Sequence, residues 1–187
     1  MRKLTKLLAL ILLLCIAVST LASCDVLDQV LGMLGLNSQP VDYAGSVVLD
    51  WTSESAKCEV QSVKTFVDGD TTHFYVPTSV NSAGFVKARY LGIDTPESTG
   101  KIEKWGKAAS KFTRSKLENA TSIVIESDDA NWNVDSTGDR FLLWIWYQPS
   151  EGAAYRNLNI ELLQEGLAIA NKSASNRYGE TCMAAIA

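Results

Sequence analysis

Apolar and polar residues alternate along several short stretches of the chain. Such a period of two predicts β-strands, because successive side chains of a strand point to opposite faces of the sheet. The predicted strands cover residues 46–51, 59–67, 71–76, 85–93, 122–127 and 140–147. Turn residues stand between them, and the Asp-Gly pair at residues 68–69 is a strong hairpin signal.

The apolar period lengthens in three other segments, which predict helices at residues 102–117, at residues 157–165 and from residue 178 onward. In the first, Trp105, Ala109 and Phe112 are spaced as one stripe of an amphipathic helix, so we expect them to pack inward. Gly166 is expected to cap the second helix. Consecutive strands with helices inserted late predict a small barrel covered by helices, rather than alternating βαβ units.

The N-terminal residues follow a different plan. Three basic residues precede an apolar run over residues 7–18, which is shorter than the roughly 20 residues of a membrane-spanning helix. Leu-Ala-Ser-Cys then follows at residues 21–24 and resembles a bacterial lipobox. We predict a lipoprotein signal peptide over residues 1–23 and a lipid on Cys24. The alternative is an ordinary signal peptide with an incidental cysteine.

The predicted lipoprotein signal has consequences for the organisation of the chain. We expect an extracytoplasmic protein that is anchored to the bacterial cell membrane through the lipid on Cys24. Residues 24–45 would form a membrane-proximal tether, with one or two helical turns near residues 26–34. Residues 46–187 would then form a single domain.

Charge and cysteines limit the chemistry of this domain. Removing residues 1–23 takes away three of the 17 basic residues and none of the 21 acidic ones, so the net charge becomes −7. Proteins that bind nucleic acid through bulk charge are basic, so phosphate binding here would depend on local groups or on a metal. Cys58 and Cys182 can form a disulfide in an oxidising compartment or stay as two free thiols, and the sequence leaves both open.

Two segments gather carboxylates around predicted turns. In the first, Asp68 and Asp70 flank a glycine and can face a hard cation. In the second, Arg89 lies on a predicted strand, and Asp94-Thr95-Pro96-Glu97 follows where that strand ends. Each motif alone has a structural interpretation, as a hairpin turn or as a strand end.

A third polar segment, residues 135–140, is a turn that delivers Arg140 to the start of a strand, where a solvated arginine is the ordinary interpretation. Phosphodiester hydrolysis needs neutralised charge, an activated water and a stabilised five-coordinate phosphorus. Arginines and a cation meet the first and last needs, and a carboxylate can act as general base. Carboxylates and a main-chain carbonyl form an oxygen-only set that favours Ca²⁺ or Mg²⁺ over zinc.

Taken together, these segments resemble the staphylococcal nuclease (thermonuclease) family. Asp-Gly-Asp-Thr at residues 68–71 and Arg-x4-Asp-Thr-Pro-Glu at residues 89–97 stand in the family's order. Residues 103–113 and 159–168 are similar to the family's first and second helices. The resemblance covers residues 59–187. It implies a fold that is mainly β with α, namely a five-stranded OB-fold barrel with about three helices.

The resemblance also implies a metal site and a substrate. Asp70 and Asp94 would ligate Ca²⁺ through their side chains, Thr95 would ligate it through its carbonyl, and Asp68 would lie close behind. The substrates would be DNA and RNA, preferably single-stranded or frayed. We expect a monomer.

The same resemblance assigns the catalytic roles. Glu97 would be the general base or would orient the water. Arg89 and Arg140 would bind the scissile phosphate and stabilise its transition state. The alternatives are an OB-fold lipoprotein that binds nucleic acid or another polyanion without cutting it, and a structural lipoprotein.

Three departures from the family pattern limit this transfer. Asp139 stands between Gly138 and Arg140, where the family usually has none. Ser136-Thr137 replaces a Lys-Tyr pair that often contacts nucleotide phosphate. Residues 171–173 are Asn-Lys-Ser where the family's prototype carries tyrosines near the base, so we expect weaker nucleotide binding.

Overall fold

The computed structural model describes residues 41–171 and 175–186. The chain divides into two compact units, residues 1–41 and 42–187. The predicted signal peptide, the lipidated Cys24, the helical turns near residues 26–34 and most of the predicted tether lie outside the described residues. Within the described ranges, no helix has the length and apolar character needed to cross a membrane.

The second unit is built around one curved sheet. Its strands follow the order β1 (Lys57–Glu59), β6 (Ser122–Glu126), β7 (Phe141–Gln148), β4 (Phe85–Tyr90), β3 (Thr71–Tyr75) and β2 (Ser62–Phe66), with β8 (Arg156–Asn157) paired to β7. The β4–β7 pair is parallel, and the other pairs in this sheet are antiparallel. A small second sheet pairs β5 (Ile93–Asp94) with β9 (Ile169–Ala170).

The two ends of the sheet are neighbouring parts of one bent segment. β1 and β2 are separated only by Val60 and Gln61, within the predicted strand at residues 59–67. The Val60 amide donates to the Ile123 carbonyl in β6 at 3.0 Å, whereas the Gln61 amide donates to the Tyr75 carbonyl in β3 at 2.9 Å. If β1 and β2 are counted as one bent strand, the order from β1 to β2 through the main sheet contains five strands. The predicted OB-like fold, mainly β with α, is confirmed.

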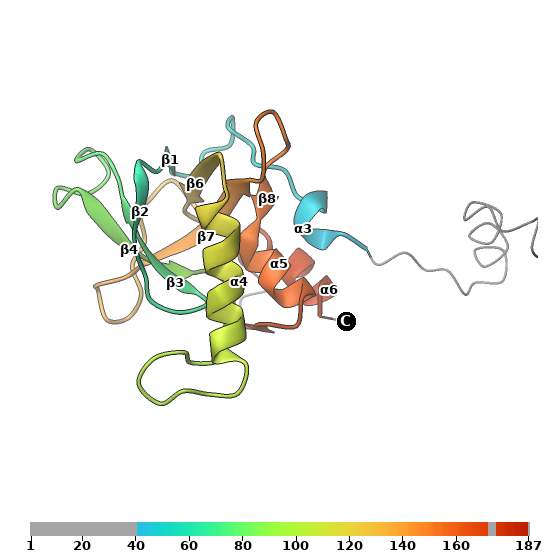
Figure 1. Ribbon diagram of the computed structural model, residues 1–187. Coiled ribbons are helices and arrows are strands. Elements are labelled where there is room, and N and C mark those ends of the chain that lie inside the picture. The colour runs from blue at the N-terminus through green and yellow to red at the C-terminus, as the bar shows by residue number, and fades with distance from the viewer. Residues whose placement is uncertain (1–40, 172–174, 187) are drawn as a thin grey trace, which may run out of the picture. The chain divides into compact units, whose positions relative to one another are not determined.

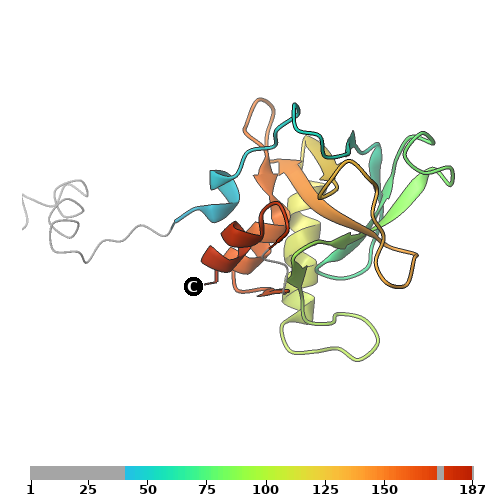
Figure 2. The ribbon, with the colours of Figure 1, turned by 180° about the vertical axis from the view of Figure 1, so that it is seen from behind.

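Four described helices cover the sheet: α3 (Tyr43–Ser46), α4 (Gly106–Glu118), α5 (Leu158–Gln164) and α6 (Gly179–Ala184). Figures 1 and 2 show α3, α5 and α6 at one end of the domain and the strands β2, β3 and β4 at the opposite end. The Asn157 side chain caps α5 by accepting from the Ile160 amide at 3.1 Å. The core consists of buried apolar residues of the strands and of α5, including Trp144 and Trp146, both with 0% exposure.

The strand predicted at residues 46–51 is wrong. Residue 46 ends α3, and irregular chain follows. A tertiary contact explains the difference, because Arg156 binds both carboxylate oxygens of Asp42 at 2.7 Å, and Asp42 caps the short helix through the Gly45 amide. Ala44 is fully buried, and its amide bonds Gln164 in α5. The compact unit therefore begins at Asp42, four residues before the predicted boundary at residue 46.

Two other predicted elements change at their ends. The strand predicted at residues 85–93 is divided into β4 and β5, because Gly92 adopts a positive φ of 78° at the turn. The first predicted helix begins only at Gly106, and Trp105 is 62% exposed instead of packing inward. The buried stripe of α4 consists of Gly106, Ala109, Thr113 and Leu117.

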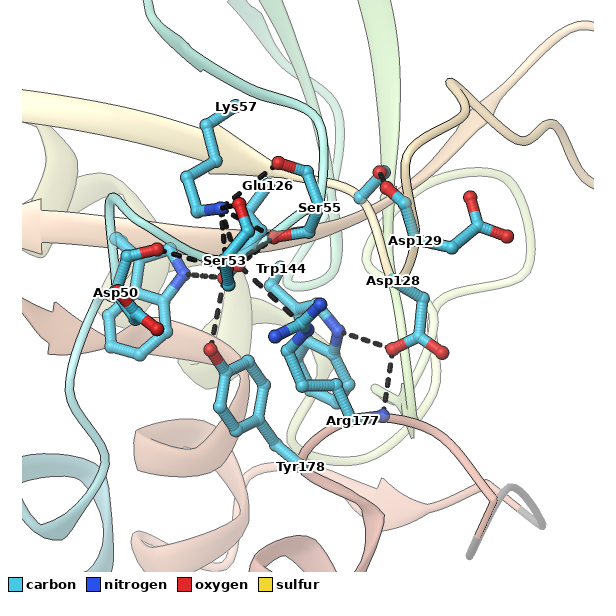
Figure 3. Close-up of polar contacts among 12 residues, drawn as sticks. Asp50, Ser53, Ser55, Lys57, Glu126, Asp128, Asp129, Trp144, Arg177 and Tyr178 are labelled. Atoms are coloured by element: carbon cyan, nitrogen blue, oxygen red, sulfur yellow. Dashed lines mark hydrogen bonds and ion pairs between the residues drawn. The ribbon is translucent and has the colours of Figure 1, made fainter.

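A buried polar network lies between β6, β7, the chain before β1 and the start of α6 (Figure 3). Glu126, at 0% exposure, accepts from Ser55 Oγ at 2.5 Å, Trp146 Nε1 at 2.8 Å and the Tyr178 hydroxyl at 3.2 Å. Lys57 Nζ lies 3.6 Å from the same carboxylate, and its side chain is 5% exposed. This network joins both ends of the domain to the sheet.

The two cysteines in the described part of the chain are free thiols. Cys58 is half-buried in β1, and Cys182 is buried in α6. Burial raises the pKa of the Cys182 thiol to about 11.

Candidate active site

Asp70 is the buried centre of the predicted site. Its side chain is 1% exposed, and its Oδ1 atom pairs with the Arg89 guanidinium. Its Oδ2 atom accepts from the Thr95 amide at 2.7 Å, and the Thr71 hydroxyl donates to Oδ1 at 3.1 Å. The register of the sheet explains the arrangement, because Thr71 in β3 is paired with Arg89 in β4.

Arg89 joins Asp70 to the second predicted metal ligand, Asp94. One terminal nitrogen of Arg89 pairs with Asp70 and the other pairs with Asp94. The Arg89 side chain is 18% exposed and that of Asp94 is 52% exposed, so the cluster runs from the interior to the surface. The structure therefore brings Asp70, Arg89, Asp94 and Thr95 together, although they come from two different motifs.

The environment of Asp70 changes its protonation. Burial, together with the neighbouring charge of Asp68, raises the pKa of Asp70 to about 6, against the lowering effects of Arg89 and the Thr95 amide. Asp68 lies directly behind, since it is 8% exposed and its Oδ1 atom accepts from the Asp70 amide at 3.2 Å. For Arg89, burial acts to lower the pKa, but Asp70 and Asp94 outweigh burial and raise it.

Gly69 is needed because α4 lies directly on this turn. A Cβ atom added at Gly69 would lie 2.7 Å from the Ala109 Cβ atom and 2.8 Å from Thr95 Oγ1. The Thr113 hydroxyl, also on α4, donates to the Gly69 carbonyl at 2.5 Å. The glycine of the first motif therefore lets helix and turn pack closely, which positions Asp70.

Glu97 is held in place through its backbone. Its carbonyl accepts from the Glu103 amide at 2.8 Å, and its own amide donates to Glu103 Oε2 at 3.2 Å. A Cβ atom added at Gly106 would lie 2.1 Å from the Glu97 carbonyl oxygen, so only glycine fits at the start of α4. Glu97 is exposed, and no hydrogen bond or ion pair within the described ranges restrains its carboxylate. The residue is therefore fixed in position while its carboxylate faces solvent.

Arg140 lies at the edge of the cluster. Phe141 and Leu142 in β7 are paired with Ala88 and Arg89, and Arg140 directly precedes β7. By alternation, Arg140 has the same face as Leu142, the partner of Arg89. Its guanidinium pairs with Asp135 at 2.7 Å, within its own turn. The Thr137 hydroxyl and Arg140 lower the pKa of Asp135 to about 2. Arg140 is therefore ion-paired with Asp135 of its own turn. Within the described residues, it forms no hydrogen bond or ion pair with Asp70 or Asp94.

The additional residue of the third motif has a partner of its own. Asp139 Oδ2 lies 2.5 Å from Lys87 Nζ, which belongs to β4. Sequence reasoning missed Lys87 as a residue of this face. Its position two residues before Arg89 was the available signal, because residues two apart on a strand share a face.

The donor chemistry of the cluster fits a hard cation. The carboxylates of Asp70 and Asp94 and the carbonyl of Thr95 offer only oxygen, which suits Ca²⁺ or Mg²⁺. No three His, Cys, Asp or Glu side chains form a metal-binding group in the described ranges. In this structure the Arg89 guanidinium joins the two carboxylates that a cation would share.

OB-folds bind oligonucleotides and oligosaccharides on one face of their sheet. A family model described as staphylococcal nuclease homologue matches residues 87–185, more than half of the chain. The chain therefore belongs to the staphylococcal nuclease homologues, a family with a nuclease or nucleic-acid-binding function. The matched range includes Arg89, Asp94, Thr95, Glu97 and Arg140. A search of curated proteins gave no significant match.

Proposed function

We propose that this protein is a calcium-dependent nuclease that hydrolyses phosphodiester bonds in DNA and RNA. The observation that supports this most strongly is the position of Arg89. Its guanidinium lies between a buried carboxylate, Asp70, and an exposed one, Asp94. An arginine fork pairs with phosphate oxygens as well as with carboxylates, so a phosphate reaching Arg89 arrives beside the proposed cation ligands.

Asp70, Asp94 and the Thr95 carbonyl would hold Ca²⁺, which when bound supplies positive charge against the scissile phosphate. Arg89 binds a phosphate oxygen and stabilises the charge that develops on it. Arg140 adds a second guanidinium once its pairing with Asp135 is exchanged for phosphate. Glu97, exposed and fixed through its backbone, accepts a proton from the attacking water.

The place of action is part of the proposal. The predicted signal peptide and Cys24 would put the nuclease outside the bacterial cell membrane as a lipid-anchored monomer. Cells grown with a labelled fatty acid test the anchor. We expect the label in the wild-type chain and no label in Cys24→Ala. Labelling that persists in Cys24→Ala would contradict the anchor.

Cleavage of heat-denatured DNA and of RNA by residues 25–187 tests the activity. We expect cutting with Ca²⁺, little cutting in chelator, and a loss of about 10²- to 10⁴-fold in Glu97→Gln, because general-base catalysis contributes on that order. Glu151→Gln is the matched control, since Glu151 is exposed on a distant turn. A folded wild-type protein that retains DNA on a filter without cutting it would favour the binding alternative.

A further inference from the structure

The outer face of β3 and β4 continues beyond the candidate active site. Burial alternates along β4, so Phe85, Lys87 and Arg89 lie on the outer face and the residues between them are buried. In β3 the outer positions are opposite these residues, with His73 paired to Lys87 and Tyr75 paired to Phe85. Successive outer positions are about 6.8 Å apart along an antiparallel strand, so Phe85 lies about 13 Å from Arg89.

The far end of this face is aromatic and accessible. Tyr75 is 42% exposed, and Phe85 is half-buried beside it. Lys64, exposed on β2, places its Nζ atom 3.3 Å from the centroid of the Phe85 ring and 5.5 Å from that of Tyr75. We call Lys64, His73, Tyr75, Phe85 and Lys87 the outer strip.

Positive charge is concentrated in the middle of the outer strip. Burial lowers the pKa of His73, and the nearby charges of Lys87 and Lys64 lower it further, while Asp139 acts in the opposite direction. The pairing of Asp139 with Lys87 is solvent-accessible, because their side chains are 62% and 35% exposed. Exposed ion pairs of this kind contribute little stability, so an incoming phosphate can replace Asp139.

We propose that the outer strip binds single-stranded nucleic acid that extends away from the scissile phosphate at Arg89. Bases stack on Tyr75, beside the Phe85 ring that Lys64 covers, and the backbone phosphates contact Lys64 and Lys87. Aromatic platforms with interleaved cations are how proteins hold single strands without sequence preference. This inference rests on the proposed function, since it takes Arg89 as the position of the scissile phosphate.

The outer strip accounts for three features of the sequence. The net charge of −7 predicted for residues 24–187 excludes binding through bulk charge, whereas the outer strip supplies local cations beside the site. Aromatic residues expected near residues 171–173 are replaced by Asn-Lys-Ser, and Tyr75 provides a stacking surface elsewhere. Asp139, the extra residue of the third motif, acts as the counter-ion that nucleic acid displaces.

Fluorescence anisotropy with a labelled oligo(dT) in chelator tests binding without cleavage. Stacking contributes about 1–3 kcal/mol per base, so Tyr75→Ala is expected to raise the Kd for the full chain about 5- to 150-fold. An abasic oligonucleotide of the same length is the matched ligand, and its Kd should not change. Equal weakening for both ligands, or no weakening for oligo(dT), would overturn the stacking role of Tyr75.

The cationic part is tested with exposed residues whose substitution leaves the core intact. Lys64→Gln should weaken the binding of both oligonucleotides and reduce the slope of the Kd with salt concentration by about one counterion. Asp139→Asn should tighten binding several-fold. Lys111→Gln, on the exposed side of α4, is the control for Lys64→Gln, because it makes the same change of charge. Equal Kd values for Lys64→Gln, Asp139→Asn and the Lys111→Gln control would overturn the proposal.

A comparison of substrates separates this inference from the proposed function. If both hold, outer-strip variants cleave a thymidine nitrophenyl phosphodiester at the wild-type rate but show a raised KM for a 20-nucleotide strand. If the outer-strip variants have the wild-type KM for the 20-nucleotide strand and both substrates are still cleaved, only this inference is overturned. Outer-strip-dependent binding without cleavage of either substrate would overturn only the catalytic function.

Discussion

Two buried carboxylates in this domain differ in what their cations connect them to. Glu126 is surrounded by Ser55, Trp146 and Tyr178. Its cations are Lys57, which is 5% exposed, and Arg177, which lies 4.0 Å away and is 29% exposed. Asp70 is equally buried, but its cation Arg89 is 18% exposed and also reaches the surface residue Asp94.

The difference distinguishes a structural cluster from a reactive one. The network of Glu126 connects the chain before β1 with the start of α6 (Figure 3), and within the described ranges neither Lys57 nor Arg177 forms an ion pair with a second carboxylate. Arg89, by contrast, pairs with Asp70 and with the exposed Asp94, so a ligand that reaches Asp94 from solvent also meets Arg89. A buried charge by itself therefore does not indicate function, whereas a buried carboxylate that shares its cation with an exposed carboxylate indicates a candidate site.

The largest effect on stability is expected from Glu126→Gln. Removing one partner of a buried ion pair leaves the other charge uncompensated, at a cost of about 3–5 kcal/mol. Urea unfolding followed by tryptophan fluorescence measures this, with Glu151→Gln as the control. The folded fraction should keep its cleavage rate. If Glu126→Gln is as stable as the control, the ion pair of Lys57 with Glu126 does not contribute to the free energy of unfolding.

A smaller effect is expected from the pH dependence of Asp70. Burial raises its pKa in the folded protein to about 6, from the ordinary value of 3.8 that applies in an unfolded chain. Between these values the folded state binds more protons, so the free energy of unfolding should fall as pH rises from about 4 to about 6. The contribution is of order 1–3 kcal/mol. Urea titrations in chelator should show this slope in the wild type and not in Asp70→Asn.

Asp70→Asn at neutral pH should not destabilise the fold, because it removes a buried charge whose ionisation lowers stability, while Arg89 keeps Asp94 as its partner. Cleavage should nevertheless be lost, since Asp70 is a proposed calcium ligand. The measurement pairs urea unfolding with the nuclease assay. Destabilisation as large as that of Glu126→Gln would remove the distinction between the two carboxylates.

The smallest effect concerns the thiols and leaves stability unchanged. Cys58 is half-buried, whereas Cys182 is 2% exposed and its pKa is raised to about 11 by burial. A thiol reagent at neutral pH should therefore modify Cys58 first, because the thiolate is the reactive form. Peptide mapping after brief labelling measures this, with Cys58→Ser as the control. Faster labelling of Cys182 would show that α6 opens readily.

Local patterns and the family resemblance together predicted the cluster of Asp70, Arg89 and Asp94, but neither pointed to the network of Glu126. Alternation placed Arg89 on a strand face, the turn residues placed Asp70 and Asp94 at strand ends, and the resemblance implied that the three meet. Glu126 lies next to the end of the strand predicted at residues 122–127, and a glutamate is ordinarily solvated. Its partners come from residues 55, 57, 146, 177 and 178, and no local pattern connects them.

The same limit explains the errors at the element ends. The strand predicted at residues 46–51 was displaced by the ion pair of Asp42 with Arg156, which lies far along the chain. Trp105 satisfied the helical period, but the contact of Gly106 with the Glu97 carbonyl fixes the start of α4 after it. In both cases a tertiary contact outweighed local propensity.

The bent segment from Lys57 to Phe66 also determines the order in which the domain can be completed. Its second half pairs with β3, as in Val63 with Phe74, so a short loop is enough to form this contact. Its first half pairs with β6, as in Cys58 with Ile125, and must wait until much more of the chain is synthesised. During synthesis β1 therefore exposes an unpaired edge, and contacts between such distant residues favour slow folding.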